Sequence, residues 1–219
     1  GLLRLAAGVA ALGGLAGCAA SSRPDALPPA VADTYAWRLP PGFPAPVVPA
    51  DNPMSDEKVR LGRWLFYDER LSGNQQYSCA SCHRQELAFT DGLGRAVGST
   101  GEIHPRSAMS LANVAYNRTL NWADPDVARL EDQLTVPFFN VDPIELGLAG
   151  REAEVVERLH GEGLYRDLFA AAFPGRSDPI SLETVRYALA SFERTLISGD
   201  SAYDRLVFAD DRSAMSDER

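Results

Sequence analysis

Residues 79–83 read Cys-Ala-Ser-Cys-His, and this motif constrains the chain more than any other feature. The pattern C-x-x-C-H is typical of covalent c-type haem attachment. Two thiols one helical turn apart can each add to a haem vinyl group, which places the imidazole of the next residue under the iron. The spacing therefore predicts Cys79 and Cys82 as the haem anchors and His83 as an iron ligand.

Two other interpretations of the cysteine pair have to be weighed. A thioredoxin-like redox pair would need a βαβ setting, and stretches with strand alternation are scarce in this sequence. A zinc site would need two further ligands, which a chain with 3 cysteines does not readily supply. Haem attachment is therefore the favoured interpretation.

Length and charge limit the remaining classes of function. The chain has 219 residues, which is enough for one sizeable core or two small ones. Its formal net charge is -9, and no basic cluster is present that could meet phosphate groups. The composition thus argues against a nucleic-acid partner.

The N-terminus has the pattern of an export signal. One arginine, Arg4, precedes an uncharged apolar stretch that is too short to span a membrane. Residues 15–18, Leu-Ala-Gly-Cys, resemble a bacterial lipoprotein processing box, in which Cys18 would be lipidated after removal of residues 1–17; a plain cleavage site with a stray cysteine is the alternative. Export to the periplasm agrees with the motif at 79–83, because c-type haem is attached outside the cytoplasm.

The body of the chain is predicted to be mostly α-helical. Residues 18–50 are rich in proline and predict an extended tether to the membrane anchor. Ser55 can cap a helix that runs on through Leu65. Further helices are expected at about 126–136, 152–172 with a glycine break, and 181–197, the last opened by Ser181.

The sixth coordination position of the iron separates a carrier of electrons from a catalyst. A monohaem electron carrier would fill this position with methionine or histidine, and Met109 is the best candidate downstream of the motif. Its other interpretation is a core methionine at the start of a short helix. His104 could be a surface residue or a ligand in one redox state, and His160 is more simply explained as a helix-capping residue.

Four blocks of sequence carry a resemblance to a known family. The segments SCASCHRQELAFTDG (78–92), HPRSAMSLANVAYN (104–117) and TLNWADPDVARLEDQLTVPFFNVDPIELG (119–147, which holds two blocks) resemble the bacterial di-haem cytochrome c peroxidase superfamily. Within this superfamily, the sequence around residues 99–122 is most similar to the MauG and MbnH types. The resemblance implies a cytochrome c-like helical haem domain with long loops, covering about residues 51–200.

The resemblance also implies roles for individual residues. His83 would be the proximal ligand of the peroxidatic haem. Gln133 and Pro137 match the family's distal Gln-x-x-x-Pro, and Glu145 would be the distal carboxylate, although the gap after Pro137 is longer than is usual in the family. General acid-base chemistry on peroxide needs such a carboxylate, while Gln133 can donate a hydrogen bond without titrating.

Two further residues take their expected roles from the same resemblance. Trp122 would match the tryptophan that lies between the two haems. Asn113 would match the asparagine that helps to hold a calcium ion between the domains. Taken singly, these side chains have simpler explanations: Trp122 as a core residue, Gln133 as a residue on a solvated helix and Glu145 as a charge at a helix N-terminus. Their order behind a haem motif favours the functional roles instead.

The family resemblance implies a periplasmic di-haem c-type peroxidase. Such an enzyme uses hydrogen peroxide to form high-valent haem iron, which oxidises an electron-donor protein or a tryptophan on a partner protein. The sequence MSDE occurs at residues 54–57, at the start of the first predicted helix, and again within the final MSDER. This repeat predicts the start of a second haem domain at 201–219. The alternative is a monohaem c-type electron carrier with Met109 as the distal ligand.

Overall fold

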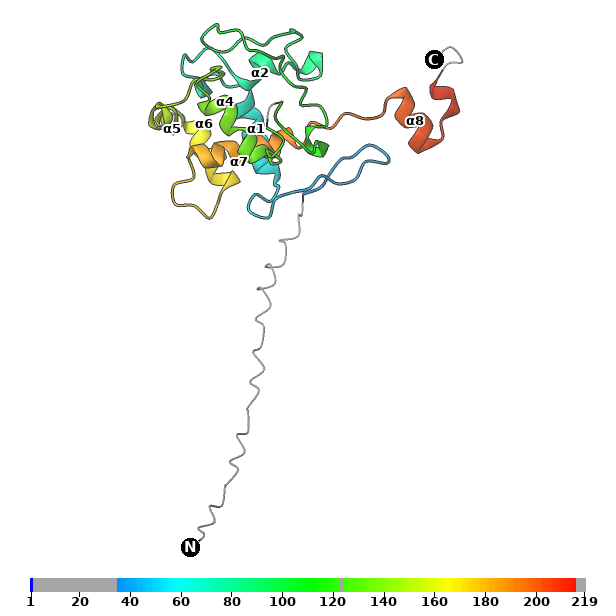
Figure 1. Ribbon diagram of the computed structural model, residues 1–219, viewed down its shortest axis with the longest axis horizontal. Coiled ribbons are helices and arrows are strands. Elements are labelled where there is room, and N and C mark those ends of the chain that lie inside the picture. Colours follow the sequence, from blue (N-terminus) through cyan, green and yellow to red (C-terminus); the bar gives the residue numbers. More distant parts are fainter. Residues whose placement is uncertain (2–34, 123, 216–219) are drawn as a thin grey trace. The chain divides into compact units, whose positions relative to one another are not determined.

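The computed structural model describes residues 1, 35–122 and 124–215, and the regular secondary structure in this part is almost entirely helical, with long loops between the helices (Figure 1). Its helices are α1 (Asp56–Phe66), α2 (Cys79–Cys82), α3 (Leu130–Gln133), α4 (Thr135–Phe139), α5 (Glu152–Gly161), α6 (Gly163–Ala172), α7 (Leu182–Glu193) and α8 (Ala202–Ala209). Single 3-10 turns are η1 (Glu69–Leu71), η2 (Gln85–Leu87), η3 (Val114–Tyr116) and η4 (Arg212–Ala214). Extended pairing within the described residues is limited to two isolated bridges, Arg84–Thr90 and Val97–Ile103. The prediction of a mostly α fold is confirmed.

Helices α1 and α7 form the centre of the fold (Figure 1). Ser55 caps α1 by accepting a hydrogen bond from the Lys58 amide at 3.2 Å, and Ser181 caps α7 in the same way through Thr184. The two helices approach closely at Gly62, where an added Cβ would lie 2.0 Å from the Ala188 carbonyl oxygen. The core side chains of the two helices are Leu61, Leu65, Phe66, Val185, Ala188, Leu189 and Phe192. Both predicted helix starts are confirmed. They could be predicted because each cap joins residues only three positions apart.

The remaining helices differ from the sequence-based prediction mainly in the middle of the chain. A single helix was expected at 126–136, whereas the structure has the two short helices α3 and α4, joined through Leu134. Pro137 explains the interruption, because it has no amide hydrogen to donate to the preceding turn. The expected break between 152 and 172 occurs at Glu162, which separates α5 from α6.

The proline-rich segment before α1 packs against the domain along part of its length. Phe43 meets Tyr116 edge to face with ring centroids 5.8 Å apart, and the Tyr116 hydroxyl donates to the Pro44 carbonyl at 2.8 Å. Pro46 is buried. Phe43, Pro44 and Pro46 of the predicted tether therefore contact the domain, whereas Val47 stays 86% exposed.

Several predictions about the two ends fall outside the described residues. They concern the signal at residues 1–17, the lipidation of Cys18, the tether up to residue 34, and the helix start at 216–219. The described residues after α7 include α8, which begins at the Ser201 cap. No helix in the described ranges is long and apolar enough to cross a membrane.

Candidate functional site

The cysteine motif forms the short helix α2 and the turn that follows it. The amide of Ser78 donates to the Ser81 hydroxyl at 3.0 Å, which closes the first turn around Cys79. The His83 amide donates to the Cys79 carbonyl at 2.9 Å. Cys79 and Cys82 are both free thiols, as haem attachment requires. The local hydrogen bonds thus hold the two thiols and the imidazole in one turn.

The loop after α2 orients the imidazole of His83. Ala88 and Phe89 both have positive φ, and the Phe89 amide donates back to the Arg84 carbonyl at 2.8 Å. This tight turn directs the Phe89 carbonyl oxygen at Nδ1 of His83, 2.8 Å away. A carbonyl can only accept, so Nδ1 carries the proton and Nε2 keeps a lone pair for a metal. Burial also lowers the pKa of His83, which favours the neutral form that binds iron.

The thiols lie in surroundings that keep them protonated. Burial raises the pKa of the Cys82 thiol to about 11, and the carboxylates of Asp91 and Glu145 raise it further. Burial also raises the pKa of the Cys79 thiol, and the charge of Glu193 is the second largest cause. A thioredoxin-like pair works through a thiolate of lowered pKa, so the structure argues against that alternative. Among residues 35–122 and 124–215 no group of three or more His, Cys, Asp or Glu side chains could hold a metal ion.

The predicted distal residues lie on α3, α4 and the loop that follows them. Gln133 ends α3 and Pro137 lies four residues on, across the joint at Leu134. Gln133 is half-buried, and its side-chain amide makes no hydrogen bond with the described residues. Its amide is therefore free to donate to a ligand.

The loop from 140 to 148 folds back along α4 and carries Glu145. The Leu146 amide donates to the Pro137 carbonyl and the Leu148 amide to the Phe138 carbonyl, both at 2.9 Å. The side chain of Asn140 donates to two carbonyls of the loop at 3.1 Å and closes it into a compact turn. These bonds hold the loop that carries Glu145 against α4.

A short loop segment connects Glu145 with the cysteine motif. The Cys82 thiol donates to the Val97 carbonyl at 3.7 Å, and the Ser99 amide donates to the Glu145 carbonyl at 2.8 Å. The charge of Glu145 also contributes to the raised pKa of Cys82. Burial raises the pKa of Glu145 itself, an effect that His104 partly offsets. The structure thus brings the cysteine motif, Pro137 and Glu145 together from segments far apart in the sequence. A partly buried carboxyl group with a raised pKa is suited to accept and return a proton.

His104 is buried, and the surface interpretation from sequence is wrong. Its Nε2 lies 3.1 Å from the Ile144 carbonyl oxygen, next to Glu145. Gly98 packs against the same carbonyl, where an added Cβ would lie only 1.9 Å from the oxygen. Glu102 accepts the Ile144 amide at 3.0 Å from the other side. His104 therefore holds the loop that carries the carboxyl group.

Residues 56–212 match the family model described as di-haem cytochrome c peroxidase. The chain belongs to the di-haem cytochrome c peroxidase family. The resemblance inferred from the motifs is confirmed, and the family description agrees with a c-type haem on Cys79 and Cys82.

Several relatives of this peroxidase family are similar over most of the chain. The methylamine utilization protein MauG of Methylorubrum extorquens is 38% identical over 169 residues, which cover 77% of this chain and 46% of the relative. The cytochrome c peroxidase of Escherichia coli is 30% identical over 176 residues, or 80% of this chain and 36% of the relative. A crystal structure of a MauG-like protein associated with microbial copper homeostasis is 47% identical with a TM-score of 0.80, over 84% of this chain and 52% of that one. The chain spans about half the length of the relatives it matches.

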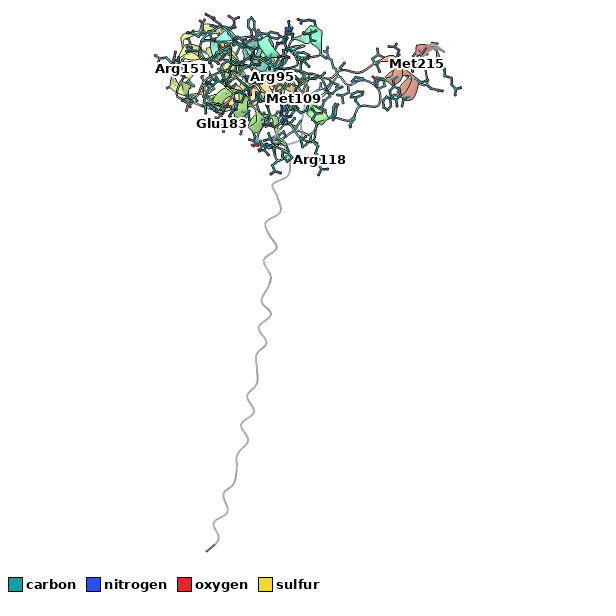
Figure 2. The ribbon with its side chains drawn as sticks, turned by 45° about the horizontal axis from the view of Figure 1, so that its top comes forward. Arg95, Met109, Arg118, Arg151, Glu183 and Met215 are labelled. Carbon is teal, nitrogen blue, oxygen red and sulfur yellow. The ribbon has the colours of Figure 1, made fainter. Side chains whose placement is uncertain are left out.

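Met109 lies in an extended segment and is half-buried within the body of the domain (Figure 2). The prediction of a core methionine at the start of a helix is wrong, because η3 begins only at Val114. The backbone carbonyl of Met109 interacts with the His83 ring and raises its pKa against the larger effect of burial. The backbone of Met109 therefore lies close to the His83 ring.

Trp122 is exposed at the surface, whereas the side chain of Asn113 is hydrogen-bonded within the domain. Trp122 is 55% exposed, and its indole nitrogen donates to the Ser107 carbonyl at 3.3 Å, so it is not a core residue. Asn113 has a left-handed backbone conformation with φ 61°, and its amide group pairs with both backbone groups of Ser198 at 2.8 and 2.9 Å. The oxygen of Asn113 is thus used within the domain, and the calcium site stays a prediction.

Two buried carboxyl groups near the motif were missed from the sequence. Glu193 ends α7 and is 3% exposed; burial raises its pKa to about 8, and its Oε2 has no hydrogen-bond partner. Asp91 is 4% exposed, and its Oδ2 is equally unpartnered. A signal for Glu193 was present, since it lies four residues after Leu189 on the apolar face of the helix. Unpartnered buried oxygens beside the thiols fit a site in which a further group is bound.

Proposed function

We propose that this chain forms the peroxidatic haem domain of a periplasmic di-haem c-type peroxidase. Cys79 and Cys82 would hold the haem through thioether bonds, and His83 would ligate its iron. When bound, the haem supplies the iron at which hydrogen peroxide is reduced to water. The observation that carries the proposal is the position of the partly buried Glu145, on the loop bonded to Pro137 and next to the segment 97–99 that Cys82 contacts.

Each distal residue has a chemical task in this proposal. Glu145, as the carboxylate, takes a proton from one oxygen of hydrogen peroxide and returns it to the other, so that the departing oxygen leaves as water. Gln133 orients the peroxide through its amide N–H groups without titrating. Pro137 has no side-chain atom that could bind iron, so it would leave room for peroxide at the haem.

The electrons come from outside this set of residues. We propose a small electron-donor protein or a tryptophan on a partner protein as their source, with a second haem and the exposed Trp122 on the route. Similarity to proteins named cytochrome c peroxidase and MauG supports both proposed electron sources, the donor protein and the tryptophan on a partner protein. The lipid anchor at Cys18 and the periplasmic location rest on the sequence pattern alone.

The test is Glu145→Gln in the haem-loaded protein expressed from its natural gene. The change keeps the shape and removes the titrating carboxyl group, so the reaction with hydrogen peroxide should slow by about 10²-fold or more. Haem content, measured by mass, should stay the same. In the wild type the rate should fall as pH is lowered through the raised pKa of Glu145, because only the carboxylate accepts the proton; the variant should lack this dependence.

The matched control is Glu157→Gln, which makes the same change at an exposed position of α5. We expect its reaction rate to equal that of the wild type. An unchanged rate in Glu145→Gln would show that another group moves the proton.

A further inference from the structure

The short helix α3 carries Gln133, and little within α3 itself fixes the direction of that side chain. The helix has only 4 residues, and a helix of this length is not stable by itself. Its N-cap residue, Arg129, makes no side-chain capping hydrogen bond. The direction in which Gln133 points is therefore set by the contacts that α3 makes with the rest of the domain.

Glu131 connects α3 to the long helix α7. This residue is only 1% exposed, and both of its carboxylate oxygens accept hydrogen bonds from Nη2 of Arg194 at 2.7 Å. Its backbone carbonyl accepts a hydrogen bond from Nη1 of Arg186 at 2.9 Å. Arg186 lies on α7, and Arg194 follows the last residue of that helix. One end of α7 and its middle thus hold Glu131 at its side chain and at its backbone.

Asn52, from the segment before α1, adds a further donor to Glu131. Its Nδ2 donates to Oε1 of Glu131 at 2.7 Å and to the Tyr187 carbonyl of α7 at 3.0 Å. The Lys58 ammonium donates to Oδ1 of Asn52 at 3.0 Å, which fixes the orientation of the amide group. Donors from two segments therefore converge on one buried residue, and each of them would be costly to lose there. This arrangement leaves α3 little freedom to turn about its axis.

Gln133 lies on the side of α3 that faces away from this anchor. Successive helical residues are rotated by about 100°, so residues two positions apart point in nearly opposite directions. A turn of α3 about its axis would thus move the half-buried Gln133 amide. We propose that Arg186 and Arg194 are positioning residues, which act through Glu131 to aim the Gln133 amide at a ligand on the haem iron. This inference rests on the proposed function, in which Gln133 is the distal donor.

Carbon monoxide on the reduced, haem-loaded protein is the probe, and infrared spectroscopy measures its stretching frequency. A hydrogen bond to the oxygen of carbon monoxide lowers this frequency, because it draws electron density from the iron into the antibonding orbital of the ligand. Gln133→Leu should therefore raise the frequency. Arg186→Met removes one donor to α3 and leaves the pair of Glu131 and Arg194 intact; it should shift the frequency towards that of Gln133→Leu. Arg60→Met, the matched change at an exposed position of α1, should leave it unchanged.

Arg194 is tested in the double variant Glu131→Gln, Arg194→Met, which avoids leaving a buried carboxylate without its partner. This variant should also raise the frequency, and if it does not fold, Arg186→Met decides the question alone. In a Gln133→Leu background neither change should shift the frequency further, because no donor is left to misplace. A lower thermal unfolding midpoint with an unchanged frequency would show a purely structural role and overturn the proposal. A further shift in the Gln133→Leu background would also overturn it, since the arginines would then act by another route.

The same measurements separate failure of this inference from failure of the proposed function. If carbon monoxide binds and Gln133→Leu leaves the frequency unchanged, Gln133 does not meet the ligand, and the positioning role fails while the role of Glu145 still stands. If carbon monoxide does not bind to the reduced wild type, the position opposite His83 is closed. That result would overturn the positioning role and the proposed peroxidatic site together.

Discussion

His104 and Ile144 are joined by a hydrogen bond, with Nε2 of the imidazole 3.1 Å from the carbonyl oxygen. The carbonyl can only accept, so Nε2 is the protonated nitrogen. Ile144 directly precedes Glu145, and both residues of the pair are covered by the loop around Gly98. The position of the proposed catalytic carboxyl group therefore depends on a histidine that does not itself touch peroxide.

Replacing His104 by leucine should loosen this loop. The Ile144 carbonyl would lose its donor in a buried place, which costs about 1–3 kcal/mol in the free energy of unfolding. We expect urea unfolding at a lower midpoint and a slower reaction with hydrogen peroxide, at unchanged haem content. His104→Gln keeps an N–H donor at a similar distance and should recover part of both losses. If leucine and glutamine behave alike, the hydrogen bond is not what positions the loop.

Gly98→Ala should disturb the same loop from its other side. The added Cβ would lie 1.9 Å from the Ile144 carbonyl oxygen, so the backbone must move. Overpacking of this kind costs about 1–3 kcal/mol, which thermal unfolding would detect. Gly94→Ala is the matched control, because its Cβ would meet nothing within 4 Å. Equal melting temperatures of the two variants would contradict the close packing at Gly98.

Met109→Leu should leave the absorption spectrum of the haem-loaded protein unchanged. The backbone of Met109 contributes to the pKa of His83 and so lies close to this ring, and we expect the Met109 side chain to be badly placed to ligate the iron from the side opposite His83. Spectra of the oxidised and reduced protein would be compared with those of Met54→Leu, the same change at a buried position before α1. The loss of a methionine-to-iron band in Met109→Leu alone would support the monohaem electron carrier.

Glu193 should make stability depend on pH. Burial raises its pKa from 4.5 to about 8, so between these values the folded state binds one more proton than the unfolded state. Its contribution is fully present below pH 4.5 and is lost as pH rises towards 8, by at most about 1.4 kcal/mol per pH unit.

Glu193→Gln should remove that slope from the unfolding free energy, and urea titrations across this pH range would show it. Glu157→Gln, at an exposed position of α5, should keep the wild-type slope. A slope that persists in Glu193→Gln would mean that another buried group titrates.

The local parts of this protein were determined by the sequence itself. The cysteine motif at 79–83, and the caps at Ser55 and Ser181, act through hydrogen bonds between residues a few positions apart, so their spacing was enough to predict them. The family could be inferred for a related reason, since its blocks are short and keep a fixed order.

Only the tertiary structure decided how distant segments meet. The burial of His104 against Ile144, and of Glu193 at the end of α7, follows from packing between segments that are far apart along the chain. The contacts of Phe43 and Pro44 with Tyr116 likewise join segments that are far apart along the chain. Such contacts are set by which apolar surfaces cover one another, and that choice is made by the whole chain at once.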